Sequence, residues 1–241
     1  MDQRAGTLSI ETSRNLLLRR LAPHDRDLLR PHLEPCLLKS RQILHHAKLP
    51  MQHVYFIESG LVSVAARVSR DRWVEVWLIG SEGMTGIPIV LGDDAEPPLR
   101  RIVQVGGTAL RLPSGVLRQA MAESASLRRM LSLYVQVVLL QTSQSGACNS
   151  HHTLKERLCR WLLLARDGLK DNSLPLTHSV LARLLGVRRP SVTSCLGVLE
   201  EMGSIRNTRG MVTVTNAQRL EEATCDCHRI ITREQRRLLA G

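Results

Sequence analysis

Polar side chains able to bind nucleic acid are concentrated between residues 188 and 194. The set contains two guanidinium groups and three hydroxyl groups: Arg188, Arg189, Ser191, Thr193 and Ser194. Guanidinium groups bind phosphates and guanine edges, and short hydroxyl side chains bond to phosphates and base edges. The apolar residues Val192, Leu196 and Leu199 recur at helical spacing in the same segment. This pattern predicts a helix with one apolar face and one face whose chemistry suits double-stranded DNA.

A tight turn and a second helix must hold that helix in place. Ala182 is small enough for close helix packing, and Gly186 lies four residues on, where the chain must turn sharply. Val192 then supplies an apolar contact between the helices, and Pro190 suits a first helical turn because its missing N–H would have no partner there. We therefore expect a helix-turn-helix over residues 178–197. An ordinary helix pair in a helical core remains the alternative.

The residues that follow predict a β-hairpin. Residues 199–203 resemble the end of a helix closed by Gly203. Residues 204–214 contain two short strand patterns around a turn with Asn and Gly. A helix-turn-helix followed by a hairpin is a winged helix, and this hairpin would place Arg206 and Arg209 on the phosphate backbone.

The composition is consistent with an anionic partner but does not prove one. The chain has 241 residues, enough for two domains, and a formal net charge of +11. A basic protein attracts nucleic acid electrostatically. A high arginine content can also reflect genome composition, so charge alone does not decide the function.

The sequence lacks the signals that are typical of several other classes of protein. No segment approaches the roughly 20 apolar residues of a membrane span, and the first residues lack a secretory signal pattern. The sequence also lacks a nucleophile elbow, a phosphate-binding Walker loop and a convincing carboxylate pair. We expect a cytoplasmic protein that is not an enzyme and has no cofactor.

The six cysteines are scattered without a Cys-x-x-Cys motif, which is typical of reduced thiols. Cys225, Cys227 and His228 could reach one metal ion, but no fourth ligand is apparent and the spacing matches no common zinc pattern. Adjacent histidines such as those of the pair 151–152 point apart, so shared ligation is not expected. We therefore expect packed thiols on a C-terminal helix and no metal site.

The N-terminal half has the pattern of a small β-protein. Short helices are expected at 15–21 and 24–30, the second stopped by Pro31. Short strand patterns with glycine turns follow at 54–57, 61–65, 73–79, 102–105 and 108–112. Such closely spaced strands predict an antiparallel sandwich or jelly roll.

A long helix should connect the two halves. Residues 126–144 contain no Pro or Gly, and from Met130 to Leu140 the predicted helix is apolar nearly all round. A helix of this kind must be covered on two sides. One side can pack on the roll, and the same helix of a second subunit is the simplest cover for the other. A single buried core helix is the alternative.

This order of parts resembles the Crp–Fnr regulators over nearly the whole chain. The best local matches are residues 54–62, 156–163 and 174–177. The resemblance implies an α+β protein with a cyclic-nucleotide-binding-like β-roll sensor (1–123), a dimerisation helix (124–147) and a winged helix-turn-helix (148–241). It also implies Thr177 as an N-cap at the DNA interface, a bacterial homodimer on a symmetric operator, and RNA polymerase as a partner if the protein is an activator.

The family's ligand residues are where this sequence departs from the pattern. Members that bind cyclic nucleotide carry a Gly-Glu pair, and here that position is Gly86-Ile87. Arg100 and Arg101 lie near the position of the family's phosphate-binding arginine but are shifted along the sequence from it. Gly83 and Gly86 could offer backbone N–H groups to an anion. We expect a ligand other than cyclic AMP, or no ligand, and these four residues are the candidates for an effector site. The cysteine group of the iron–sulfur branch is also missing, because the N-terminal region has only Cys36.

The DNA sequence recognised should differ from the family's known operator. Arg189 retains an arginine found in the cyclic-AMP receptor protein, whereas Pro190 and Ser194 replace other base-contacting residues. We expect a transcription regulator whose operator is still two-fold symmetric. The alternative is a roll-domain signalling or scaffold protein whose winged helix binds protein.

Overall fold

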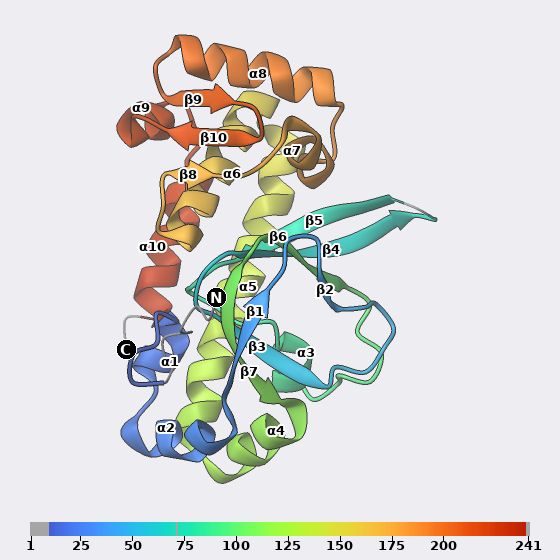
Figure 1. Ribbon diagram of the computed structural model, residues 1–241, viewed down its shortest axis with the longest axis vertical. Helices are drawn as coiled ribbons and strands as arrows, with labels where there is room; N and C mark the ends of the chain where they lie inside the picture. The colour runs from blue at the N-terminus through green and yellow to red at the C-terminus, as the bar shows by residue number, and fades with distance from the viewer. Residues whose placement is uncertain (1–9, 71, 240–241) are drawn as a thin grey trace, which may run out of the picture.

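The computed structural model describes residues 10–70 and 72–239 and confirms the expected α+β fold. A β-roll forms one end of the molecule, a winged helix domain forms the other, and a long helix runs between them (Figure 1). Two large apolar clusters correspond to these two ends: one joins the roll to the first half of the long helix, and the other fills the winged helix domain.

The roll consists of two antiparallel sheets. The first has the order β1-β7-β3, with β1 at Glu34–Leu38, β7 at Gly107–Pro113 and β3 at His53–Ile57. The second has the order β2-β6-β4-β5, with bounds Ile43–His45, Arg100–Val105, Leu61–Ser69 and Arg72–Ile79. The predicted strands are confirmed. Strand β4 continues past its expected end and pairs with β5, and this hairpin projects sideways beneath α7 (Figure 1).

Short helices close the roll. They are α1 (Leu16–Arg20), α2 (Pro23–Leu29), the 3-10 helix η1 (Arg30–His32), α3 (Ile87–Val90) and α4 (Ser114–Glu123). Helix α2 ends at Leu29, ahead of Pro31 as expected, and Pro31 then lies in the first turn of η1. Asn15 caps α1 and also donates to the carbonyls of Ile57 and Gly83, which ties this helix to the roll.

The long helix α5 spans Ala125–His151, seven residues beyond the predicted end at Gln144. Gly146 does not end it, since a single glycine costs only about 1 kcal/mol in a helix. Ser124 caps its start by accepting from the N–H of Leu127. The helix ends where His152 adopts an extended conformation.

The winged helix domain begins immediately afterwards. Thr153 and Glu156 form a capping box at the start of α6 (Leu154–Leu169). The remaining elements are β8 (Ser173–Leu174), α7 (His178–Leu185), α8 (Arg189–Glu201), β9 (Ile205–Thr208), β10 (Met211–Val214) and α9 (Ala217–Glu222). The three strands form a small sheet in the order β8-β10-β9.

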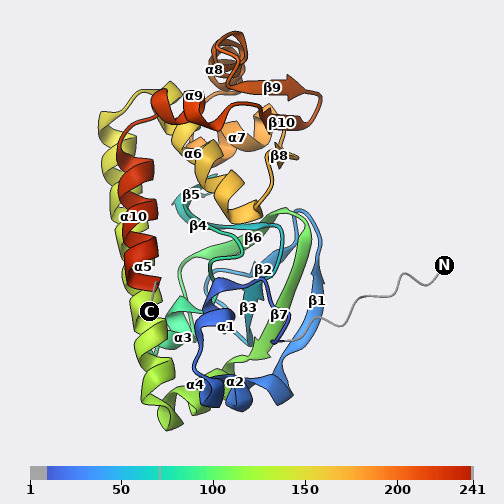
Figure 2. The same cartoon turned by 90° about the vertical axis from the view of Figure 1, so that its left-hand side faces the viewer.

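The last helix, α10 (Cys227–Leu239), packs along α5 (Figure 2). Its buried residues include Ile231 and Leu239, and Leu239 joins the same apolar cluster as Leu131 of α5. We expected a second subunit to cover the side of α5 that faces away from the roll. Helix α10 of the same chain covers part of it instead. Among the described residues, no helix combines the length and apolar character needed to cross a membrane.

Candidate nucleic-acid interface

The turn between α7 and α8 has the predicted geometry. Gly186 adopts a left-handed conformation with φ of 69°, which glycine reaches without steric penalty. The N–H of Val187 donates to the carbonyl of Ala182 at 2.9 Å, closing the end of α7. At the other end of α7, the hydroxyl of Thr177 accepts from the N–H of Val180, so Thr177 is the N-cap.

Helix α8 has one buried face and one exposed face. Val192, Leu196 and Leu199 are fully buried in the core of the domain. The opposite face is exposed and carries the predicted set Arg188, Arg189, Ser191, Thr193 and Ser194. Pro190 lies in the first turn, as expected. The helix lies at the end of the molecule far from the roll (Figure 1), so nothing among the described residues covers this face.

The hydroxyl of Thr193 is already engaged. It donates to the carbonyl of Arg189 at 3.1 Å and lies 2.9 Å from Nδ1 of His178. The other ring nitrogen of His178 lies 3.1 Å from Oδ1 of Asn207 in β9. His178 thus connects both helices of the motif to the wing. The sequence analysis did not identify this role, because the three residues meet only in the folded domain.

The wing presents the two predicted arginines. Arg206 and Arg209 are exposed, and Gly210 forms the tight turn between β9 and β10 with φ of 78°. The N–H of Asn207 donates to Glu200 at 2.8 Å, which ties the base of the wing to α8. The hairpin therefore presents two exposed guanidinium groups close to α8, which we call the recognition helix.

The two glycines of the expected effector group serve close packing. A Cβ at Gly83 would overlap the hydroxyl of Tyr134, and a Cβ at Gly86 would overlap the side chain of Val54. Ile87, which follows Gly86, is buried in α3. Tyr134 donates to the carbonyl of Met84 and accepts from its N–H, both at 3.0 Å. Gly83 therefore allows α5 to approach the roll closely, and Gly86 allows the start of α3 to pack against β3.

The two arginines of that group have different environments. The guanidinium of Arg100 stacks on Trp73, with its carbon 4.2 Å from the ring centre. Arg101 is only 1% exposed. Its Nη1 donates to the carbonyl of Leu99 at 2.6 Å, and its Nε has no partner among the described residues. Burial lowers the pKa of Arg101 to about 10.

The β4–β5 hairpin contacts the winged helix domain directly. The indole of Trp161 in α6 donates to Glu75 in β5 at 2.6 Å. Arg72 donates to the carbonyl of Gly186, in the turn of the helix-turn-helix, at 3.0 Å. Burial raises the pKa of Glu75 to about 7, although the hydrogen bond from Trp161 and the charge of Arg160 oppose the shift. No local sequence pattern indicates these contacts, because they join residues of different domains.

The C-terminal thiols are not arranged as their sequence order suggested. His228 turns away to Asp167, with its Nε2 3.1 Å from the carboxylate. Cys225 and Cys227 instead meet Cys148 and His152 at the end of α5. All six cysteines are free thiols, as expected. The sequence analysis missed this grouping because α10 folds back across a long sequence separation.

Together, the β-roll, the long helix and the exposed recognition helix define a winged-helix DNA-binding protein with a cyclic-nucleotide-binding-like domain. Residues 156–223 match the Crp-like helix-turn-helix domain family. This region is therefore a Crp-like helix-turn-helix domain, and the chain as a whole resembles transcription regulators of the Crp/Fnr type.

Individual relatives are distant in sequence but cover most of the chain. The global nitrogen regulator of Synechocystis is 25% identical over 182 residues, which are 72% of this chain and 80% of that protein. FixK2 from Bradyrhizobium japonicum has a similar fold, with a TM-score of 0.68 and 16% identity over 80% of this chain and 98% of that one. A Crp/Fnr-family regulator from Eubacterium rectale gives a TM-score of 0.65 and 18% identity, covering 86% and 96%.

Proposed function

We propose that the protein is a homodimeric bacterial regulator that places one α8 helix per subunit in successive major grooves of a two-fold symmetric operator. The observation that carries this proposal is the exposed polar face of α8, which lies beside the wing arginines and away from the roll. Helices presented in this way read base edges, while neighbouring basic groups bind phosphates. Such a regulator acts in the cytoplasm, and RNA polymerase is a further partner if it activates.

A strip of exposed residues along α5 supports the dimer. The strip recurs at alternating spacings of three and four residues: Ser132, Gln136, Leu139, Ser143, Gly146 and Ser150. This is the spacing at which two helices pack side by side, and small residues allow a close approach. Leu139 lies in the middle and is 59% exposed. A two-fold pair of these strips would set two α8 helices for half-sites about 34 Å apart.

The effector of this proposal is an anion bound inside the roll at Arg101. A buried guanidinium without a carboxylate partner is unfavourable unless an anion compensates its charge. Burial and the nearby charge of Arg101 also lower the pKa of His45 to about 3, so this imidazole is uncharged at neutral pH. Ile87 removes the acceptor that would bind the ribose of cyclic AMP. Binding of an anion would shift α5 and re-aim the winged helices.

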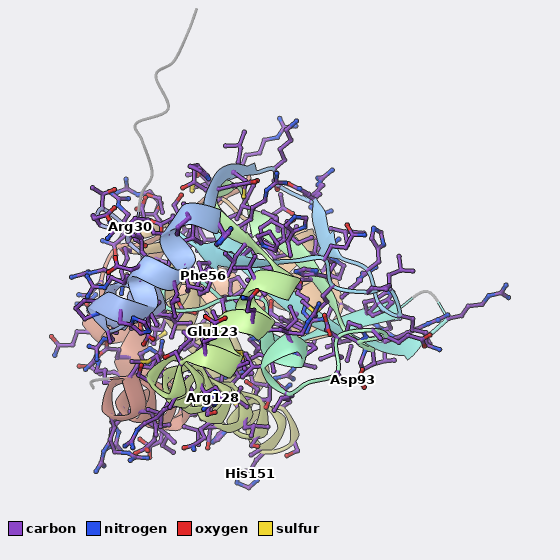
Figure 3. All side chains as sticks on the ribbon, turned by 90° about the horizontal axis from the view of Figure 1, so that it is seen from below. Arg30, Phe56, Asp93, Glu123, Arg128 and His151 are labelled. Carbon is purple, nitrogen blue, oxygen red and sulfur yellow. The ribbon has the colours of Figure 1, made fainter. Side chains whose placement is uncertain are left out.

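The DNA-binding part is tested by footprinting the protein on its own upstream region and by titrating Arg189→Ala. A bidentate contact to guanine contributes about 1–3 kcal/mol, so the variant should bind roughly 5- to 150-fold more weakly. Arg30→Ala is the control, since Arg30 lies on the opposite end of the molecule in surface ion pairs (Figure 3). An asymmetric footprint, or unchanged and salt-insensitive affinity, would favour a protein-binding winged helix instead.

The dimer is tested separately by sedimentation of Leu139→Arg. This substitution places a charge in the middle of the exposed strip without touching the buried face of α5, so the helical content should be unchanged. We expect a monomer with greatly weakened operator binding. A variant that remains dimeric would show that α5 is not the contact between subunits.

A further inference from the structure

Three thiols and one imidazole converge where α5 ends. Cys148 lies in the last turns of α5, and His152 is its C-cap residue. Cys225 and Cys227 come from the start of α10 and the residues before it. The ligand atoms of the four residues all lie within 4.8 Å of one another, and the three cysteines are buried. A cluster of this composition forms only because α10 folds back onto α5.

The separations fit a single ion in tetrahedral coordination. Two sulfurs at the zinc–sulfur distance lie about 3.8 Å apart, and a sulfur and an imidazole nitrogen about 3.6 Å apart. Here the sulfurs of Cys148 and Cys225 are 3.6 Å apart, and the Cys227 sulfur is 3.6 Å from Nδ1 of His152. The side chains therefore surround a point that one ion could occupy with little movement.

We propose that Cys148, His152, Cys225 and Cys227 bind one Zn²⁺ ion that fastens α10 to the end of α5. Three cysteines and one histidine form a common structural zinc set. Thiolate and imidazole ligands disfavour Ca²⁺ and Mg²⁺, which take oxygen ligands. The ligands of an iron–sulfur cluster bind different irons and so must stand farther apart than these four atoms do.

The surroundings suit the charge of such a site. Three thiolates and one Zn²⁺ leave a net charge of −1, and the guanidinium groups of Arg157 and Arg160 both attract a thiolate at Cys148. Arg160 is 5% exposed, and its Nε has no partner among the described residues. The amide of Gln144 donates to the Cys227 sulfur at 3.2 Å. These are the outer contacts that orient ligands and offset charge around a bound metal.

The position of the site gives the ion a structural role. It lies at the joint between α5 and α6, where α10 begins to run alongside α5 (Figure 2). The hydroxyl of Thr224 donates to the carbonyl of Glu156 at 3.2 Å, so the segment before α10 already touches the start of α6. An ion here would hold the long helix, the winged helix domain and the C-terminal helix in one arrangement, and its binding energy would add to folding stability.

Metal content of the purified full-length protein tests the assignment. Elemental analysis and native mass spectrometry of reduced protein should give about one zinc ion per chain. Cys148→Ser, Cys227→Ser and His152→Ala should each lose most of it. Cys36→Ser and His46→Ala are matched controls that should retain it, because Cys36 lies in β1 and His46 is an exposed residue beside β2, both in the roll.

A second measurement does not depend on how the variants fold. Wild-type protein is first freed of metal with a chelator and then titrated with Co²⁺. It should develop the intense visible absorption of Co²⁺ in a tetrahedral thiolate site, and added Zn²⁺ should abolish this absorption by displacing the Co²⁺. The idea is overturned by protein that contains no metal and gives no such absorption, by acid-labile sulfide, or by a Cys148–Cys225 disulfide under reducing conditions. Because no DNA is involved, these outcomes are independent of operator binding.

Discussion

Trp161 of α6 donates its indole N–H to Glu75 of β5 at 2.6 Å, and this hydrogen bond helps to join the winged helix domain to the roll, together with the bond from Arg72 to the carbonyl of Gly186. The second carboxylate oxygen of Glu75 is buried and has no partner among the described residues. Burial removes water from the carboxylate and so disfavours its charged form, which raises the pKa of Glu75 to about 7. A titratable side chain therefore lies within the contact between the two domains.

We expect stability to fall as the pH rises from about 4.5 to about 7. The folded chain retains the Glu75 proton up to about pH 7, while the unfolded chain releases it near the ordinary pKa of 4.5. The contribution is complete below the unfolded pKa and is lost as the folded form ionises, a total of about 3 kcal/mol. Urea unfolding across this range should show the decline, and Glu75→Gln should lack that part of it. Glu123→Gln, an exposed carboxyl, is the control; equal pH profiles for both variants would refute the linkage.

His178→Ala should weaken DNA binding without removing any direct contact to DNA. The imidazole joins Thr193 in α8 to Asn207 in the wing, so its loss frees both and loosens the wing against the recognition helix. We expect a loss of about 1–2 kcal/mol in stability and weaker operator affinity. Gel-shift titration and thermal unfolding measure the two effects. Full affinity in the variant would show that the wing does not need this bridge.

The wing arginines should act on affinity but not on sequence preference. Arg206 and Arg209 are exposed on the hairpin and are placed to neutralise phosphates. Each alanine substitution should weaken specific and non-specific DNA binding about equally and lower the salt slope of log affinity by about 1. Titrations at several salt concentrations measure the slope. A change in the preferred operator sequence would instead indicate base contacts from the wing.

Gly186→Ala should destabilise the helix-turn-helix by about 1–2 kcal/mol, because an L-residue is strained at a φ of 69°. A new Cβ there meets Val74 only at ordinary contact distance, so the cost is one of backbone conformation. Gly197→Ala is the matched control: Gly197 lies inside α8 with nothing near its missing Cβ, and alanine should stabilise that helix by about 0.5–1 kcal/mol. Chemical denaturation of the two variants should therefore shift in opposite directions.

The parts of the fold that could be predicted are those with local signals. The turn at Gly186, the buried face of Val192 and Leu196, and the hairpin closed by Gly210 follow from residue spacing over short distances. The predicted end of α5 at Gln144 is wrong. The helix continues through Gly146 because it is packed along its length, and this packing offsets the cost of one glycine. The residues predicted to contact DNA are exposed in the winged helix domain. Their contacts to DNA stay predictions.

The remaining features depend on contacts between distant parts of the chain. The covering of α5 by α10 brings Cys148 to Cys225, and no local pattern near either residue indicates the other. The same is true of Trp161 and Glu75, and of His178 and Asn207. The roles of Gly83 and Gly86 could not be predicted either, because a glycine that offers N–H groups and a glycine that permits close packing look alike in sequence.

The short joint between α5 and α6 has a mechanical consequence. Only His152 and Thr153 separate the two helices, and the capping box fixes Thr153 against Glu156. The connection therefore allows little relative motion between α5 and α6. With 27 residues, α5 is a lever about 40 Å long. A tilt of about 5° at the roll would displace its far end by about 3.5 Å, close to the rise of one base pair. A movement in the roll no larger than a side-chain rearrangement would thus suffice to carry the recognition helix out of register with its half-site.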